Sequence, residues 1–143
     1  MNKLYLENQL CFKVYAISRQ ITNAYRPVLE NLDITYPQYL VMLVLWKEKK
    51  ITVKELGNRL YLDSGTLTPL LKRLEQKKVL SRTRDLADER SVIITLTTEG
   101  KFLQQKAKKI PETLSKCLSI NEKEYLQLKD QLDELLTKLK TNN

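Results

Sequence analysis

The feature that most constrains the fold of this chain is a row of leucines at helical spacing near the middle of the sequence. The row consists of Leu67, Leu70, Leu71 and Leu74. Residues three and four positions apart lie on one face of an α-helix, so this row is the core face of a helix. A capping-box pattern at Thr52–Glu55 opens a shorter helix before it, with Tyr61–Asp63 as the turn. Together they predict a helix-turn-helix.

The opposite face of the second helix carries side chains suited to DNA. Short hydroxyls and an amide can bond base edges in the major groove, and cations can meet phosphates. Asp63 or Ser64 is the expected N-cap, and Gly65 leaves room for close backbone approach. Pro69 predicts either a kink or a later helix start, nearer Thr68. An ordinary core helix with a solvated basic side stays open for this segment alone. The residues predicted to face DNA are Ser64, Gly65, Thr66, Thr68, Pro69, Lys72, Arg73 and Gln76.

A β-hairpin is predicted directly after this helix. Segments 79–84 and 91–96 read as strands, because apolar residues recur at every second position of the latter. The polar tip between them, Asp85–Arg90, includes Asp88. Such a hairpin is a candidate wing, able to lay an arginine into the minor groove. Its place after a helix-turn-helix favours a wing over a merely solvated hairpin. Its arginines are Arg82, Arg84 and Arg90.

Two helices are expected before this unit. Apolar residues at helical spacing predict one over residues 7–31, and Pro27 is expected to bend its end. The next is expected to begin at Pro37, with Tyr36 at its cap, and to end near Lys49. This second helix is strongly apolar, so it should be mostly buried.

Two more helices are expected after the hairpin. Thr97 or Thr98 is expected to cap a helix that runs to about Leu118 and that Pro111 kinks or divides. Asn121–Glu124 resembles another capping box and opens a last helix whose apolar row is close to a heptad seam. That row consists of Tyr125, Leu128, Leu132, Leu135 and Leu139.

These elements predict a mainly α fold with a small β-wing, of the α+β class. Residues 1–143 are expected to form one domain, with 37–97 as the winged helix-turn-helix DNA-binding part. Residues 1–34 and 98–143 are expected to form a helical dimerisation part. Beside the core stripe of the first helix runs a second stripe, which points to a partner subunit: Cys11, Tyr15, Ser18, Thr22 and Tyr25. A homodimer of this kind matches pseudo-palindromic double-stranded operator DNA.

The charge balance favours a polyanionic partner. Lysine and arginine exceed aspartate and glutamate by 25 to 17, which gives a net charge of +8. The chain has no histidine, which removes the usual general base and most zinc sites, so an enzyme, a metal site or a cofactor is not expected. No apolar run is long enough to span a membrane, and the start lacks a signal-peptide core. A cytoplasmic protein without a membrane partner is expected.

Cys11 is the first candidate for redox chemistry, because it lies early in a helix. The helix dipole stabilises a thiolate there, and phenol hydroxyls can donate hydrogen bonds to it. Tyr15 is one turn away, whereas Tyr25 lies roughly 21 Å further along a straight helix. Antiparallel packing of two first helices would bring Tyr25 and Tyr36 of one subunit to Cys11 of the other. Taken alone, Cys11 is also compatible with a small buried packing residue.

Several motifs closely resemble the MarR family, and within it the OhrR type of organic-peroxide-sensing repressors. They cover nearly the whole chain to about Pro111, and the central motif is long enough to be specific. The matching segments are Leu6–Phe12, Tyr25–Pro27, Thr35–Val41, Leu62–Leu74 and Asp88–Arg90.

This resemblance implies a homodimeric winged-helix repressor that loses its DNA when the N-terminal cysteine is oxidised. Cys11 would react with peroxide, and Tyr25 and Tyr36 would be the partner-subunit phenols that bond it. Asp88 and Arg90 match the wing motif. Some family members form mixed disulfides with low-molecular-weight thiols and others an intersubunit disulfide. Cys117 is a candidate resolving thiol, and an unreactive packing cysteine is the alternative.

Three rival functions stay open at this point. One is a thiol peroxidase in which Cys11 attacks and Cys117 resolves, although the chain shows no evident peroxide pocket. Another is a family member that responds to small phenolic ligands, with both cysteines idle. The last is a global virulence-type regulator with broader targets.

Overall fold

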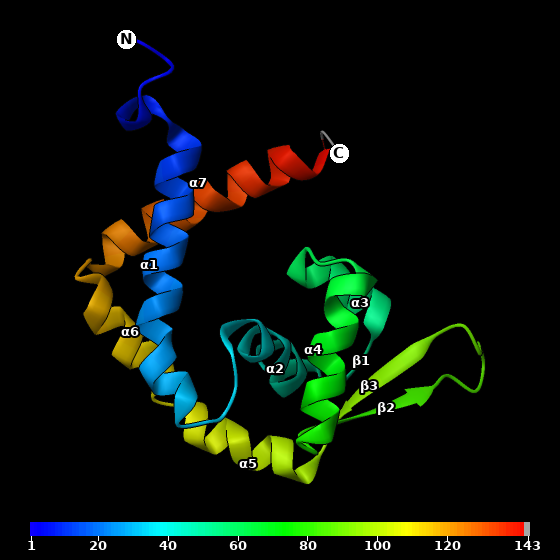
Figure 1. Cartoon of the computed structure of the whole chain (residues 1–143). Helices are drawn as coiled ribbons and strands as arrows, with labels where there is room; N and C mark the ends of the chain where they lie inside the picture. Colours follow the sequence, from blue (N-terminus) through cyan, green and yellow to red (C-terminus); the bar gives the residue numbers. More distant parts are fainter. Residues whose placement is uncertain (142–143) are drawn as a thin grey trace. The chain divides into compact units, whose positions relative to one another are not determined.

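The computed structural model describes residues 1–141, which are mainly helical with a small antiparallel sheet (Figure 1). This confirms the predicted mainly α fold with a β-wing. The chain divides into two compact units, the first made of residues 1–110 and the second beginning at Pro111. The elements in chain order are η1 (Leu6–Asn8), α1 (Leu10–Glu30), α2 (Tyr36–Glu48), β1 (Lys50–Thr52), α3 (Val53–Leu60), α4 (Ser64–Gln76), β2 (Leu80–Arg84), β3 (Val92–Leu96), α5 (Thr98–Ala107), α6 (Ile110–Leu118) and α7 (Glu122–Thr141).

The predicted leucine row forms the centre of the first unit. Leu67, Leu71 and Leu74 of α4 are at most 1% exposed, and Leu70 is half-buried. They share one core with α2, whose apolar residues are buried around most of its circumference, and with Ile94 of β3. The helix-turn-helix therefore packs against α2 and against the sheet through this shared core.

The sheet has the order β1-β3-β2, so the central strand is β3. Ile94 on β3 lies opposite Ile51 on one side and Arg82 on the other. The hairpin strands were predicted one residue too long at their starts, since β2 begins at Leu80 and β3 at Val92. Strand β1 was not predicted, because its three residues carry no alternating pattern of useful length. Its pairing anchors the hairpin to the junction between α2 and α3.

The start of α2 differs from the prediction. Thr35, not Tyr36, is the N-cap, and the helix begins at Tyr36 with Pro37 in second place. The Thr35 hydroxyl accepts a hydrogen bond from the Gln38 backbone N–H, while the Gln38 side chain accepts one from the Thr35 N–H. This reciprocal capping box explains why Gln38, although polar, is only 2% exposed.

At α3 the capping prediction is half confirmed. Thr52 caps the helix by accepting from the Glu55 backbone N–H at 3.1 Å. The Glu55 carboxylate does not return the bond among residues 1–141, because it accepts from Arg59 at 2.9 Å instead. Arg59 also bonds Glu48 at the end of α2, which fixes α3 against α2.

The first and the later helices follow the predicted plan with shorter bounds. The first covers Leu10–Glu30 rather than 7–31, and Pro27 lies within its last turn. Thr97 is the cap of α5, and the predicted long helix is divided, since α5 ends at Ala107 and α6 begins just before Pro111. The capping box at Asn121 and Glu124 is present in both directions.

Two features are absent from the part of the chain that the structure describes. None of its helices is both long and apolar enough to cross a membrane. Within the same residues no group of three or more His, Cys, Asp or Glu side chains is placed to hold a metal ion.

Candidate nucleic-acid interface and thiol sensor

Helix α4 begins at Ser64, so a start near Thr68 is excluded, and Pro69 lies inside it without ending it. Asp63 caps the helix, accepting a hydrogen bond from the Thr66 backbone N–H at 2.7 Å. This bond holds the pKa of the Asp63 carboxyl below its usual value. The cap fixes the first turn of α4, which is the part that a major groove would receive.

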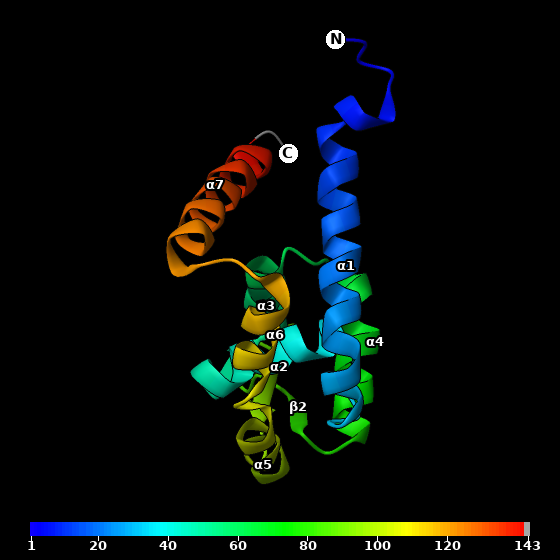
Figure 2. The same ribbon diagram turned by 90° about the vertical axis from the view of Figure 1, so that its left-hand side faces the viewer.

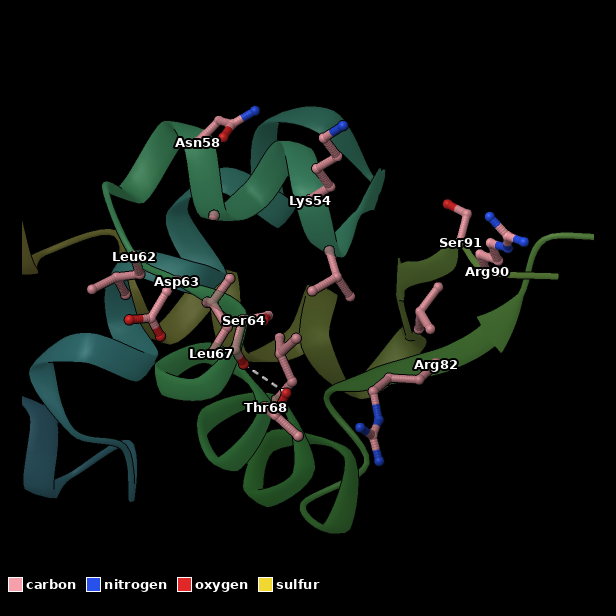
Figure 3. Close-up of a pocket in the computed structure, with 14 residues that line it drawn as sticks. Lys54, Asn58, Leu62, Asp63, Ser64, Leu67, Thr68, Arg82, Arg90 and Ser91 are labelled. Atoms are coloured by element: carbon pink, nitrogen blue, oxygen red, sulfur yellow. Dashed lines mark hydrogen bonds between the residues drawn. The ribbon is translucent and has the colours of Figure 1, made fainter. Parts of the chain in front are cut away.

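Every α4 residue predicted to face DNA is exposed: Ser64, Gly65, Thr66, Thr68, Pro69, Lys72, Arg73 and Gln76. The Thr68 hydroxyl donates to the Ser64 carbonyl at 2.7 Å, the bond drawn in Figure 3. The proton of that hydroxyl is therefore used within the helix, and its oxygen is left to accept from a base donor. The exposed face combines such short polar groups with two cations.

A groove of about 530 Å³ lies between the start of α4 and the hairpin (Figure 3). Its polar lining comes from α3, α4 and the hairpin. Lys54 and Asn58 project from α3, Ser64 and Thr68 from α4, and Arg82 and Arg90 from the hairpin. The fold thus places the predicted recognition helix and the predicted wing on one surface.

The wing loop is shaped by its own acidic side chains. Asp85 accepts a hydrogen bond from the Ala87 backbone N–H, and Asp88 accepts one from that of Arg90, both at 3.0 Å. Arg84 donates to the Glu89 carbonyl at 3.1 Å, while the Arg90 side chain is exposed. The Asp88 carboxylate therefore shapes the backbone that presents Arg90. As an anion, it supplies no positive charge for a phosphate.

Arg82 lies in a different environment from the other hairpin arginines. Its guanidinium donates to the Glu75 carboxylate from Nη2 at 3.0 Å and from Nε at 3.2 Å. Its backbone N–H donates to the same carboxylate at 3.0 Å. Arg82, which was predicted to face DNA, contacts α4 through Glu75 and also lines the groove between α4 and the hairpin. Glu75 was missed, since no sequence rule links a helix residue with a strand residue seven positions on.

Three tyrosines form a cluster where α1 meets α2. The ring centres of Tyr25 and Tyr36 are 4.8 Å apart, and Tyr39 lies 5.6 Å from Tyr25. Trp46 continues the row, 6.1 Å from Tyr39, and donates to the Gly100 carbonyl at 2.9 Å. Burial raises the pKa of the Tyr36 phenol, which therefore stays a protonated hydrogen-bond donor at neutral pH. The two phenols named from the sequence are thus neighbours in one chain.

Cys11 is exposed, in the first turn of α1. Tyr15 packs against Arg19, whose guanidinium carbon is 5.5 Å from the ring centre, and within residues 1–141 it makes no hydrogen bond to Cys11. Tyr25 lies fourteen residues further along the same continuous helix, so the cluster cannot reach Cys11 of its own chain. Cys117 is exposed too, in α6.

The first half of α1 presents an uncovered apolar face. Figure 2 shows this half projecting beyond the other elements of the first unit. The exposed apolar residues here are Leu10, Phe12, Val14, Tyr15 and Ile17. In the second unit α7 has no buried residue, and its exposed apolar residues are Tyr125, Leu126, Leu128, Leu132, Leu136 and Leu139. Apolar faces of this extent are typical of subunit interfaces.

Comparison with known proteins gives consistent results. A family model described as transcriptional regulator SarA/Rot matches residues 23–108. The organic hydroperoxide resistance transcriptional regulator of Bacillus subtilis is 51% identical over 138 residues, covering 96% of this chain and 94% of that protein. The HTH-type transcriptional regulator SarZ of Staphylococcus saprophyticus is 41% identical over 133 residues, covering 93% and 91%.

Solved structures of AbfR, a protein of Staphylococcus epidermidis, are similar throughout. Reduced AbfR bound to DNA has a TM-score of 0.81 at 44% identity, covering 95% of this chain and 93% of that one. The disulfide form of AbfR has a TM-score of 0.63 at the same identity, covering 95% and 90%.

Proposed function

The chain belongs to the MarR family of DNA-binding transcriptional regulators, in its OhrR-type, redox-sensing branch, and we propose that Cys11 is its sensor and that it acts as a repressor. It is a redox-sensing regulator and not an enzyme, since its relatives are named as transcriptional regulators. In the proposed cycle, operator DNA is held while Cys11 is a thiol and is released when Cys11 is oxidised by an organic hydroperoxide. The protein would carry out this cycle in the cytoplasm.

The observation that carries the sensor assignment is the pair of adjacent phenols, Tyr25 and Tyr36, with ring centres 4.8 Å apart. We assign the O–H groups of both phenols as hydrogen-bond donors to one thiolate, yet Cys11 of the same chain lies too far along α1 to reach them. A second subunit resolves this, because the exposed face of α1 gives a homodimer contact that brings Cys11 of one subunit to the phenols of the other. Each sensor is then an intersubunit site.

The chemistry needs no histidine and no cofactor. The Cys11 thiolate attacks the terminal oxygen of the hydroperoxide and the O–O bond breaks. The alkoxide that leaves takes up a proton and becomes an alcohol. Cys11 is then a sulfenic acid, oxidised by two electrons. A second thiol attacks its sulfur, forms a disulfide and releases water. The oxidised sulfur is bulkier and no longer accepts the two phenol hydrogen bonds as a thiolate does, so the dimer contact that held it changes.

On the DNA side, α4 enters the major groove and the wing reaches the adjacent minor groove, with two subunits reading a pseudo-palindromic operator. Replacing Arg90 with alanine is expected to weaken binding by about 1 to 3 kcal/mol, the range of one good groove contact. The expectation rests on its exposure and on the loop that Asp88 shapes. Fluorescence anisotropy at matched salt would measure the change, with Lys47→Ala at the end of α2 as a charge-matched control. An Arg90→Ala affinity equal to that of wild type would remove the wing from the interface.

Cys117 is the proposed resolving thiol, and it is exposed as that role requires. A Cys117→Ser variant is expected to form no covalent dimer after peroxide treatment, while wild type forms one that a reductant reverses. Non-reducing electrophoresis would measure this difference. A covalent dimer that persists in Cys117→Ser would refute the role. If neither protein forms one, and mass spectrometry finds Cys11 joined to an added small thiol, the partner is a low-molecular-weight thiol.

A further inference from the structure

The contact between Glu75 on α4 and Arg82 on β2 ties the two predicted reading elements together. We propose that this pair, the Glu75–Arg82 clamp, consists of positioning residues that set the wing relative to the recognition helix, and that Arg82 is not a DNA contact. The inference rests on the proposed function, because it takes α4 and the wing to read DNA together. The proposed redox cycle of Cys11 assigns no role to Glu75 or to Arg82.

The clamp uses one carboxylate for three hydrogen bonds. Oε1 of Glu75 accepts from both Nε and Nη2 of Arg82, and Oε2 accepts from the Arg82 backbone N–H at 3.0 Å. The guanidinium and the backbone of one residue are therefore fixed by a single side chain of α4, which defines an orientation as well as a distance. The Arg82 contact holds the pKa of the Glu75 carboxyl below its usual value, so the carboxylate stays charged at neutral pH.

The position of the clamp in the sheet explains why it matters. Strand β2 is at the edge of the sheet, since the order is β1-β3-β2, and within residues 1–141 no further strand pairs with its outer backbone groups. Glu75 occupies the outward N–H at Arg82. Only a short turn joins α4 to β2, with Lys78 at a φ of 63°. Without the clamp the hairpin would be held on this side by that turn and the core alone.

The clamp also explains an acidic residue on a helix that approaches a polyanion. Coulomb repulsion predicts that removing a carboxylate from α4 strengthens DNA binding. A positioning role predicts that removing this carboxylate weakens DNA binding, because a wing that is free to move loses conformational entropy when DNA binds. The two hairpin arginines differ in position. Figure 3 shows Arg82 on β2 next to α4, whereas Arg90 lies at the end of the other hairpin strand.

The test compares Glu75→Ala, Arg82→Ala and the double variant on two labelled duplexes. One carries the sequence selected by reduced wild-type protein from a random library, and the other is a shuffled version of it. Glu75→Ala is expected to bind the selected duplex about tenfold more weakly, the effect of losing a charge-assisted contact discounted for partial exposure. The shuffled duplex should be bound nearly as before. The double variant should be no weaker than either single variant.

Two controls separate positioning from direct contact. Glu89→Ala removes the same charge from the wing loop and is expected to keep or raise affinity. The slope of log Kd against log salt is expected to be unchanged in Arg82→Ala, whereas a lost phosphate contact lowers it by about 0.9. Thermal denaturation of each variant checks that it is folded, and Glu75→Gln, which keeps one acceptor oxygen for the backbone N–H, is the milder substitute.

The outcomes are distinguishable from failure of the proposed function. If wild type selects no duplex, the DNA-reading proposal itself fails. If wild type is selective but Glu75→Ala binds the selected duplex as tightly as wild type or Glu89→Ala, the clamp is refuted. A salt slope that falls only in Arg82→Ala would assign Arg82 to a phosphate.

Discussion

A Cys11→Ser variant is expected to bind operator DNA as wild type does and to keep it bound after treatment with an organic hydroperoxide. Serine preserves the shape of the side chain and its ability to accept from the phenols, but it cannot form a sulfenic acid. Wild type should lose affinity by about 5- to 150-fold on oxidation, the usual size of coupling between two sites. In Cys11→Ser this ratio should fall to one, as measured by fluorescence anisotropy before and after peroxide.

Two controls make this result specific to Cys11. Cys117→Ser removes the other thiol of the chain and should still respond, because sulfenic acid formation precedes any disulfide. Mass spectrometry should find the added oxygen on Cys11 in wild type and no oxygen on residue 11 of the serine variant. If Cys11→Ser released DNA on peroxide treatment, Cys11 would not be the sensor.

Gly100→Ala is expected to lower the free energy of unfolding by about 3 kcal/mol, at the upper end of overpacking effects. A Cβ at Gly100 would stand 2.2 Å from the Val79 carbonyl oxygen and 2.5 Å from Leu96 Cδ1. The carbonyl belongs to the backbone that enters β2, so it cannot rotate away. The Gly100 carbonyl also accepts from Trp46, and its N–H donates to the Thr97 cap at 3.1 Å. Urea denaturation of the reduced protein would measure the loss.

Gly65→Ala is the matched control for that substitution. Among the described residues, a Cβ there would meet Asp63 Oδ1 alone, at 3.4 Å, on the exposed face of α4. Stability should stay the same or rise by up to about 1 kcal/mol, since alanine favours the helix. If Gly100→Ala were as stable as Gly65→Ala, the close approach of α5 to the start of β2 would not constrain the fold.

The local parts of this fold were predictable from sequence. The leucines of α4 recur at helical spacing and proved to be its buried face, and the outward residues proved exposed, because periodicity alone decides both. The predictions failed where two local signals competed. Thr35 and Tyr36 both precede a proline, and only the reciprocal bond with Gln38 selects Thr35 as the cap.

Contacts between elements could not be predicted in this way. The approach of Tyr25 to Tyr36 depends on the turn at Asp33, a non-glycine residue with a φ of 53°, which no spacing rule anticipates. The engagement of Arg82 by Glu75 likewise depends on how closely β2 passes α4. Both contacts bear on our proposals, since one brings together the two phenols assigned to the sensor and the other is the clamp that we propose positions the wing.

The most direct measurement is a gel shift of the reduced protein on the DNA upstream of its own coding region. The same sample is followed through addition of cumene hydroperoxide and then of dithiothreitol. Redox control through Cys11 predicts a shifted band that disappears with the hydroperoxide and returns with the reductant, in wild type but not in Cys11→Ser. A band that persists through oxidation, or that disappears equally in Cys11→Ser, would contradict it.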